Sequence, residues 1–465
     1  MLQVLSAIMF YPRGGSSHAA RALARGLREQ GSSVTLVAGS RSDLGPHSDA
    51  RAFYGADVQP ASFDAALQSP DPIRYQGPPG SVPMHPSFED RPGAPDRVFA
   101  ALDDLDFERQ VQAWSRELAR AASDPDVIHL HHLTPLNEAA ARFAPSVPVV
   151  GQLHGTELLM LERIAAGPPP SWTHADRWAE RLRGWAQRCG RLLVSPAGAQ
   201  RAASVLDVPI ERMFPLPGGV DAELFAPRPV DRGRFWHDVL VAHPQGTVPG
   251  GTPGSLGYAD AEVARLASGV ILVYVGRFTA VKRLDMLISA FGEAQAGLQS
   301  PAGLVLVGGH PGEWEGEHPA ELARRTGVRG VFLAGWRAHE ELPEFFRASD
   351  AVVTASLREQ FGQSLVEGMA CCLPALAPSS LGPASIIEAG RTGWLVDSAD
   401  PAALTAALRE LVQNTDERVR RGRAARRAVC DRFTWSSVSA QLEKVLAEVA
   451  HESSIDGVAI GTAGA

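Results

Sequence analysis

The sequence predicts an α/β protein with two doubly wound domains that face each other across a cleft. In both halves of the 465-residue chain, short apolar segments alternate with amphipathic ones, a pattern typical of parallel strands joined by helices. An irregular segment that begins at Phe214 and is rich in proline and glycine separates the halves. Hydrophobic residues make up 45% of the chain, which suffices for a core in each domain.

Nine buried strands are expected from the apolar segments. They fall at residues 2–9, 34–38, 126–130 and 147–153, and again at 270–275, 304–307, 331–334, 351–354 and 374–377. Doubly wound sheets bind their ligands beyond the carboxyl ends of the strands. The residues that follow these strands are therefore the candidates for a functional site.

The first helix has start and stop signals of its own. Gly14 and Gly15 form a tight turn after the first strand, and Ser16 or Ser17 is the expected N-cap. The helix should run to about residue 30, where Gly31 supplies the stop.

Two stretches are expected to be irregular, and one is strongly basic. Residues 40–97 should form a long loop insertion or a flexible lid, and residues 229–268 a second irregular stretch. The arginine-rich residues 418–432 favour a solvated helix face, with a membrane or phosphate patch as the alternative.

The expected domains are residues 1–213 and 214–432. A helix over 433–450 is expected to pack back on the N-terminal domain, and residues 451–465 to form a disordered tail. A homodimer is left open.

Charge and cysteine content restrict the function. The net charge of −8 and the pI of about 6.0 argue against a nucleic-acid binder. The four cysteines lack metal-ligand spacing and are expected to be free thiols. The N-terminus has no basic region before its apolar residues, and no apolar run approaches the ~20 residues of a membrane helix. We expect a soluble, cytoplasmic protein.

Two glutamates flank a predicted helix start in the C-terminal half. Glu359 lies in the loop after the strand at 351–354, and Glu367 lies about one turn into the helix that begins near Gly362. A helix N-terminus offers unpaired N–H groups and a positive dipole end to phosphate or sugar oxygens. Both carboxylates can face the same cleft.

Two cations follow the strand at 270–275. Arg277 and Lys282, five residues apart in one loop, can grip a diphosphate and stabilise the charge that develops on it. Only two of the 44 basic residues are lysines, Lys282 and Lys444, so a lysine at this position suggests a need for a compact ammonium group.

Histidines follow two strands of the N-terminal half. His129, His131 and His132 end the strand at 126–130, and His154 ends the next one. No carboxylate or cysteine spacing supports a metal site at these histidines. The Asp-x-Asp pairs at 104–106 and 124–126 are interpreted as chance or helix capping.

These motifs resemble family 4 retaining glycosyltransferases of the GT-B fold, and actinobacterial members in particular. The resemblance rests on Glu359 and Glu367 as the Glu-x7-Glu motif, on Arg277 and Lys282, and less strongly on His154. It covers the chain from Gly14 to about residue 430. It implies a hexosyltransferase that moves a sugar from a UDP- or GDP-linked donor, without a metal or other cofactor, to a small-molecule or glycan acceptor. Secondary metabolism is the expected setting.

The resemblance also implies roles for individual residues. His154, Glu359, Lys282 and Arg277 are the expected catalytic residues, and domain closure would bring His154 to the donor. Donor binding is expected from Gly276, Arg277, Lys282, Arg337, Glu359, Phe361, Gly362, Gln363, Ser364 and Glu367, with Glu367 on the ribose. Acceptor binding is expected from Gly14, Gly15, Ser16, His132 and His154.

The chain departs from the family pattern at three places. Gly218 stands where the hinge often has asparagine, and residues 379–383 replace a paired-glycine loop that approaches the donor. Gly155 follows His154 where members that use inositol phosphate tend to have threonine. The resemblance therefore does not imply inositol phosphate as the acceptor of this chain.

Two other functions remain as alternatives. A dinucleotide-dependent oxidoreductase would need a Gly-x-Gly-x-x-Gly turn, which is absent after the first strand and only partly matched at 307–312. A sugar-nucleotide-binding protein without catalysis is opposed by the presence of Glu359, Lys282 and His154.

Overall fold

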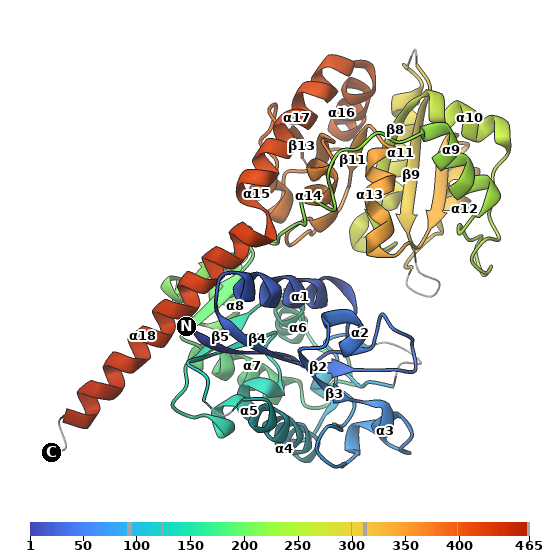
Figure 1. Cartoon of the computed structure of the whole chain (residues 1–465). Coiled ribbons are helices and arrows are strands. Elements are labelled where there is room, and N and C mark those ends of the chain that lie inside the picture. The colour runs from blue at the N-terminus through green and yellow to red at the C-terminus, as the bar shows by residue number, and fades with distance from the viewer. Residues whose placement is uncertain (91–94, 123, 299, 310–313, 398, 463–465) are drawn as a thin grey trace. The chain divides into compact units, whose positions relative to one another are not determined.

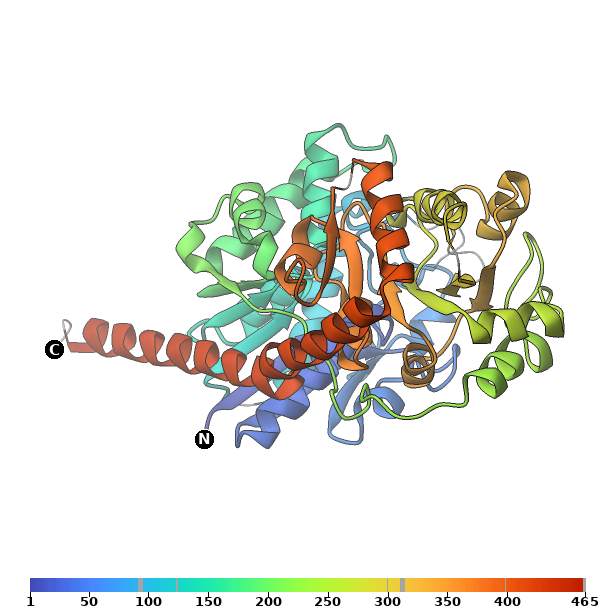
Figure 2. The ribbon, with the colours of Figure 1, turned by 90° about the horizontal axis from the view of Figure 1, so that it is seen from above.

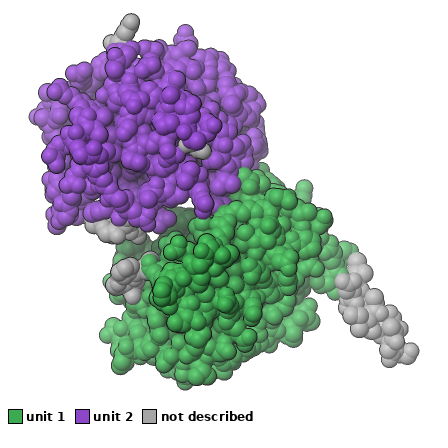
Figure 3. Space-filling model, turned by 180° about the vertical axis from the view of Figure 1, so that it is seen from behind, with its two compact units in different colours: residues 1–217, 435–465 green, residues 218–434 purple. Residues whose placement is uncertain are grey.

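The computed structural model describes residues 1–90, 95–122, 124–298, 300–309, 314–397 and 399–462. The chain forms two compact units, which Figure 3 shows in green and purple. Unit 1 contains residues 1–217 and 435–465, and unit 2 contains residues 218–434. The first break lies four residues after the expected one.

Unit 1 is built on a parallel seven-stranded sheet with the strand order β3-β2-β1-β4-β5-β6-β7. Its strands are β1 (Gln3–Ile8), β2 (Ser33–Ser40), β3 (Val58–Ser62), β4 (Val127–His131), β5 (Val149–Gln152), β6 (Arg191–Val194) and β7 (Met213–Pro215). The order runs outward from β1 in one direction and from β4 in the other, as in a doubly wound sheet. The carboxyl ends of β1 and β4 therefore lie at the point where the order reverses.

Helices cover both faces of this sheet (Figure 1). They are α1 (Gly14–Glu29), α2 (Ala50–Tyr54), α3 (Asp64–Leu67), α4 (Asp104–Ala121), α5 (Pro135–Phe143), α6 (Thr156–Ala165), α7 (Ala175–Arg188), α8 (Ala199–Leu206) and α18 (Trp435–Thr462), with 3-10 turns η1 (Pro72–Arg74), η2 (Phe99–Ala101), η3 (Pro196–Gly198) and η4 (Ile210–Arg212). Helix α1 packs against α18, and α4 packs against α5.

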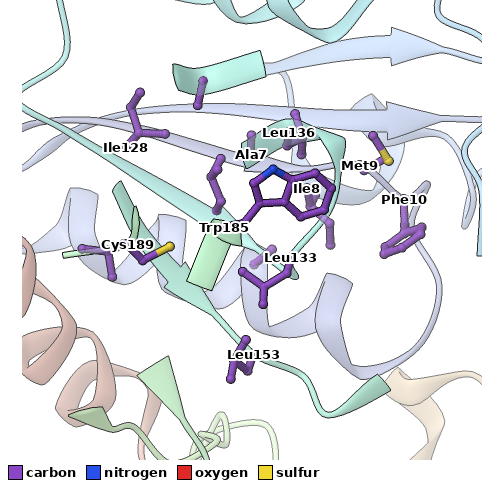
Figure 4. Close-up of a cluster of buried hydrophobic side chains, with 14 of the residues drawn as sticks. Ala7, Ile8, Met9, Phe10, Ile128, Leu133, Leu136, Leu153, Trp185 and Cys189 are labelled. Atoms are coloured by element: carbon purple, nitrogen blue, oxygen red, sulfur yellow. The ribbon is translucent and has the colours of Figure 1, made fainter. Parts of the chain in front are cut away.

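The core of unit 1 joins strand β1 to the helices around it. Ala7, Ile8, Leu136 and Trp185 are at most 3% exposed and belong to one hydrophobic cluster. Figure 4 shows the Trp185 ring lying among side chains from β1 and from the segment that follows β4. The core thereby fixes the strand ends from which the candidate histidines project.

Unit 2 is built on a parallel six-stranded sheet with the order β10-β9-β8-β11-β12-β13. The strands are β8 (Val270–Gly276), β9 (Ala302–Gly308), β10 (Val331–Gly335), β11 (Ala351–Val353), β12 (Ala375–Pro378) and β13 (Gly393–Val396). The five strands expected from the sequence are all present, and the order reverses between β8 and β11. Those two strands precede the Arg277–Lys282 loop and the Glu359 loop.

Two hydrophobic cores lie on opposite faces of this sheet. Along β8, Ile271 and Val273 join one core, whereas Leu272 and Tyr274 join the other. The helices are α9 (Arg232–His237), α10 (Asp260–Ser268), α11 (Leu284–Gln295), α12 (Pro319–Thr326), α13 (Leu342–Arg347), α14 (Gln363–Ala370), α15 (Leu381–Ile386), α16 (Pro401–Gln413) and α17 (Thr415–Arg432), with the π-helical turn η5 (Asp238–Ala242) and 3-10 turns η6 (Ala280–Lys282) and η7 (His339–Glu341).

The two stretches expected to be irregular contain regular structure. Residues 40–97 include α2, α3, η1 and the edge strand β3, which pairs with β2. Residues 229–268 include α9, η5 and α10. The prediction was wrong here because the elements are short and lie in sequence rich in proline and glycine, while tertiary packing supplies the stability that local propensity lacks.

The N-cap expected for α1 was also wrong. The helix begins at Gly14 with Arg13 as its N-cap, and no side chain caps it. Ser17 instead bonds the backbone of Arg13, accepting from its N–H at 3.0 Å and donating to its carbonyl at 3.2 Å. The left-handed conformation of Gly14, with φ of 67°, lets the helix start one turn earlier.

The C-terminal segment differs from the expected tail. Helix α18 continues to Thr462, and its last turns extend beyond the sheet of unit 1 (Figure 2). Val438, Leu442 and Val445 are at most 1% exposed and anchor it in unit 1. The sequence after residue 450 contains no proline, so the helix can continue through the segment expected to be a disordered tail. Residues 463–465 lie outside the described residues.

The arginine-rich helix α17 is not simply a solvated face. Arg418 donates to the carbonyl oxygens at the end of α16, and Arg421 lies over the Trp394 ring at 3.9 Å. Arg426 donates to the carbonyls of Ala222 and Phe225. The structure thus corrects the expectation, because part of this charge ties α17 to its own unit. In the described part of the chain, no helix is long and apolar enough to cross a membrane.

Candidate active site

Lys282 and Glu359 form an ion pair in unit 2, although 77 positions separate them in the chain. Lys282 ends η6, in the loop after β8, and Glu359 lies in the loop after β11. The backbone N–H of Leu357 donates to the carbonyl of Val281 at 2.9 Å, which joins the two loops. The Lys282 and Glu359 side chains are 18% and 22% exposed, so a ligand can reach both.

Arg277 lies at the start of the first of these loops. Its side chain is exposed and has no partner among the residues that the structure describes. The hydroxyl of Tyr274 donates to the Arg277 carbonyl at 2.7 Å and fixes the backbone there. Burial raises the pKa of Tyr274, and the nearby Glu359 carboxylate adds to the shift. Tyr274 therefore remains a hydrogen-bond donor.

The start of α14 has the expected form. Gly362 is its N-cap in the left-handed conformation, with φ of 105°, and Gln363 is its first residue. Helical amides of the first turn, here those of Gln363 and Ser364, lack intrahelical acceptors. The helix start lies only a few residues after Glu359 in the chain. The Lys282 ammonium, the Glu359 carboxylate and the unpaired amides of α14 therefore meet at one edge of the sheet.

The segment that replaces a paired-glycine loop also contacts the Glu359 loop. The N–H of Gly382 in α15 donates to the carbonyl of Glu359 at 2.9 Å. A Cβ at residue 382 would lie 2.2 Å from the carbonyl oxygen of Phe361, so this backbone approach requires glycine. The replacement loop thus still braces the Glu359 segment.

Besides Lys282 and Glu359, three more of the expected donor-binding side chains, Glu367, Gln363 and Arg337, have partners within unit 2. Glu367 is 2% exposed and bonds His339 and Gln363. The Arg337 guanidinium donates to the Ala334 carbonyl at 3.2 Å, and burial lowers its pKa. The roles expected of Arg337, Glu367, Gln363, Ser364 and Gly276 in holding a donor stay predictions.

In unit 1 the histidines after β4 and β5 form one network. His131 Nδ1 lies 3.1 Å from His154 Nε2, and His132 Nδ1 lies 3.0 Å from a carboxylate oxygen of Glu157. The same oxygen accepts from the backbone N–H of His154 at 3.3 Å. Because a carboxylate only accepts, His132 donates its Nδ1–H to Glu157. His132 adopts a left-handed φ of 67°, a conformation that costs energy and is held by the surrounding contacts.

This network is largely buried, which sets its protonation. Burial lowers the pKa of His131 and His154 well below the usual 6.5, and the pKa of His129 to about 4. Burial alone would raise the pKa of Glu157. The interaction with His132 and the backbone hydrogen bond outweigh burial and lower this pKa to about 2. At neutral pH the site holds the ionised Glu157 carboxylate beside the neutral imidazoles of His129, His131 and His154.

Gly14, Gly15 and Ser16 form the first turn of α1 after β1. Nothing lies within 4 Å of a Cβ built on either glycine, so the N-terminus of this helix is open to a ligand. Their role in acceptor binding stays a prediction, as does that of His132, which is 4% exposed.

The Asp-x-Asp pairs have structural partners. Asp106, near the start of α4, pairs with Arg74 and Arg109 at 2.8 and 3.0 Å. Asp126 accepts from the Gln3 backbone N–H at 2.7 Å. Among the described residues, no three His, Cys, Asp or Glu side chains are placed to hold a metal ion. Residues 310–312 of the partial glycine motif lie outside the described residues.

Sequence reasoning missed Glu157 and His339 as parts of these sites. Glu157 lies three residues after His154, in the first turn of α6, and this spacing is the signal that could have identified it. His339 lies in η7 after β10 and had no such signal, because its partner Glu367 is 28 positions away.

Acid should destabilise unit 1. Unfolded histidines bind protons near pH 6.5, whereas buried His129 binds one only near pH 4. The unfolded state therefore binds more protons between these values, and the free energy of unfolding should fall by about 3 kcal/mol from His129 alone as the pH drops from 6.5 to 4. Glu157 should add a loss below pH 4.5. Urea unfolding at several pH values measures the slope, and a His129→Gln variant whose slope equals that of wild type would contradict this assignment.

Comparison with known proteins gives matches along most of the chain. The family described as Glycosyltransferase Family 4 matches residues 13–224, and the family described as Glycosyl transferases group 1 matches residues 262–428. A D-inositol 3-phosphate glycosyltransferase from Thermobispora bispora is 28% identical over 382 residues, 78% of this chain and 82% of that protein. Its counterpart from Salinispora arenicola is 27% identical over 339 residues, 71% of this chain and 70% of that protein.

Solved structures share the fold. Sucrose-phosphate synthase from Thermosynechococcus elongatus matches with a TM-score of 0.64 at 18% identity, over 96% of this chain and 99% of that one. The Anabaena protein HepE, in complex with UDP, matches with a TM-score of 0.66 at 18% identity, over 96% of this chain and all of that one. At this identity the similarity establishes the GT-B architecture.

Proposed function

We propose, from the premise that this chain is a family 4 glycosyltransferase of the GT-B fold, that it transfers a sugar with retention from a nucleoside-diphosphate donor without a metal ion. Membership of this family removes the oxidoreductase alternative. The observation that carries the proposal is the Lys282–Glu359 pair beside the N-terminus of α14 and the exposed Arg277.

These groups suit a diphosphate leaving group. The Lys282 ammonium and Arg277 guanidinium supply two positive charges in one loop, the role that a divalent cation has in other phosphate sites. A diphosphate that binds Lys282 replaces its contact with Glu359 and releases that carboxylate to accept from sugar hydroxyls. Unit 2 thereby holds both halves of the donor.

The transfer step needs no base from the protein. The bond between the anomeric carbon and the diphosphate oxygen breaks while the acceptor oxygen or sulfur forms its bond on the same face. The departing phosphate oxygen takes the acceptor's proton. Lys282, Arg277 and the α14 amides stabilise the charge that develops on the diphosphate.

Unit 1 is proposed to hold the acceptor through the open N-terminus of α1 and through His154. Gly155 has a left-handed φ of 94°, which disfavours the threonine of members that use inositol phosphate. We therefore propose that the acceptor is a small molecule or glycan that carries a hydroxyl or thiol group. Inositol phosphate is one candidate acceptor to be tested. Cytoplasmic location and dimer formation stay predictions.

Thermal unfolding with a panel of nucleoside diphosphates tests the donor. A nucleotide present at 100 times its Kd should stabilise the folded state by about 2.7 kcal/mol, and either UDP or GDP should give the largest shift. The shift and donor-sugar hydrolysis should both persist in excess EDTA. If no nucleotide raises the melting temperature, the donor class is wrong. If EDTA abolishes hydrolysis and a divalent cation restores it, the metal-free mechanism is wrong.

A further inference from the structure

Glu367 has one carboxylate oxygen held by two donors. His339 Nε2 lies 2.7 Å from Glu367 Oε1, and the Gln363 amide nitrogen lies 3.0 Å from the same atom. Because an ionised carboxylate only accepts, both side chains donate to Oε1. Oε2 has no partner among the residues that the structure describes. The arrangement fixes the carboxylate rotamer and leaves the second oxygen to accept from a ligand.

His339 is itself anchored. It opens η7 shortly after the carboxyl end of β10, and its ring packs against the buried Phe225 ring with centroids 5.3 Å apart. The His339 side chain is 27% exposed, whereas that of Glu367 is 3% exposed. His339 is thus the member of the pair that solvent reaches, and it holds a carboxylate that is almost fully buried.

Gln363 is held by the hinge segment, in which Gly218 stands where the family often has asparagine. Its amide nitrogen also donates to the Gly219 carbonyl at 2.8 Å. A Cβ on Gly218 would lie 2.5 Å from the Phe361 ring and 3.3 Å from the Gln363 side-chain oxygen. Asparagine at 218 would therefore displace both side chains. Glycine at this position lets Phe361 and Gln363 pack closely against the backbone that opens unit 2.

We propose that His339 and Gln363 are positioning residues that orient Glu367 so that Oε2 accepts from a ribose hydroxyl of the donor nucleotide. The inference rests on the proposed function, since it assumes a nucleoside-diphosphate donor. It adds that recognition of the ribose depends on a histidine outside the Glu-x7-Glu motif. A hydrogen bond from a hydroxyl to a carboxylate is strong only when the carboxylate is already aligned, because otherwise ligand binding must order it.

The test compares a ribonucleotide with its 2′- and 3′-deoxy counterparts by titration calorimetry, using the nucleotide that stabilises the wild-type chain most. Wild type should bind the ribonucleotide about tenfold more tightly than at least one deoxy form, the size of one charge-assisted hydrogen bond. His339→Phe, which keeps a planar ring but removes the donor, should lower this ratio to about twofold or less. In glycosyl transfer it should raise the donor KM more than it lowers kcat.

Two further variants separate positioning from structure. His339→Gln restores an N–H donor at a similar reach and should recover most of the preference. His237→Phe, at an exposed histidine of the same unit that pairs with Asp260, should leave the ratio unchanged. Gln363→Met removes the second donor and should lower the ratio in the same direction, which keeps the test valid if His339→Phe does not fold.

The outcomes distinguish this inference from the proposal beneath it. If wild type binds no nucleoside diphosphate, the proposed donor class fails. If wild type binds one but shows no preference for ribose over either deoxy form, or if His339→Phe and Gln363→Met keep the wild-type ratio, the positioning role is overturned while donor binding stands.

Discussion

Lys282→Ala should lower kcat by about 10²–10³-fold, the loss typical of removing one preorganised donor from a developing negative charge. The ammonium group is placed at the loop after β8 and is reachable by a ligand, since the side chain is 18% exposed. Alanine leaves Glu359 without this partner, but solvent can reach that carboxylate, which is 22% exposed. The variant should therefore fold as wild type does.

The chain supplies its own control for this change. Lys444, the only other lysine, is exposed on α18 in unit 1, and Lys444→Ala should leave kcat unchanged. Steady-state kinetics together with urea unfolding separate catalysis from stability. Wild-type turnover in Lys282→Ala would remove the ammonium group from the mechanism.

Glu157→Leu should destabilise unit 1 by about 2–4 kcal/mol, because it leaves two buried donors unsatisfied, each at a cost of about 1–3 kcal/mol. Glu157 is fully buried and accepts from the His132 ring at 3.0 Å and from the His154 backbone at 3.3 Å. Leucine leaves both donors buried without an acceptor. The left-handed backbone at His132 also loses the contact that holds it.

A glutamate on the same helix provides the matched control. Glu162 in α6 is 34% exposed and pairs with Arg201 at 2.6 Å. Glu162→Leu should cost less than Glu157→Leu, about 1 kcal/mol, because solvent reaches this half-buried ion pair and such pairs contribute little. Glu157→Gln keeps an oxygen acceptor and should fall between the two. Urea unfolding and hydrogen exchange of the β4 and β5 amides measure the effects. Equal stability of Glu157→Leu and wild type would show that the carboxylate does not hold this network.

Local patterns predicted the parts of the fold that local interactions stabilise. The strand at 270–276 is a continuous apolar run and lies within one residue of its expected range. Gly362 is the N-cap of α14, where the backbone has a positive φ that glycine favours, so a glycine in the sequence indicates this helix start. By contrast, β3 and α9 lie in proline- and glycine-rich stretches whose structure depends on packing against distant segments.

The sequence by itself determined two α/β units and the strand ends that carry Lys282, Glu359 and His154, because hydrophobic periodicity and turn residues act over a few positions. Only the tertiary structure decided which side chains meet there. Lys282 pairs with Glu359 across 77 positions and His339 with Glu367 across 28, and contacts of this range follow from sheet order rather than local pattern. The same packing decided the charges: burial keeps the imidazoles of His131 and His154 neutral, whereas the hydrogen bond from His132 keeps Glu157 ionised despite its burial.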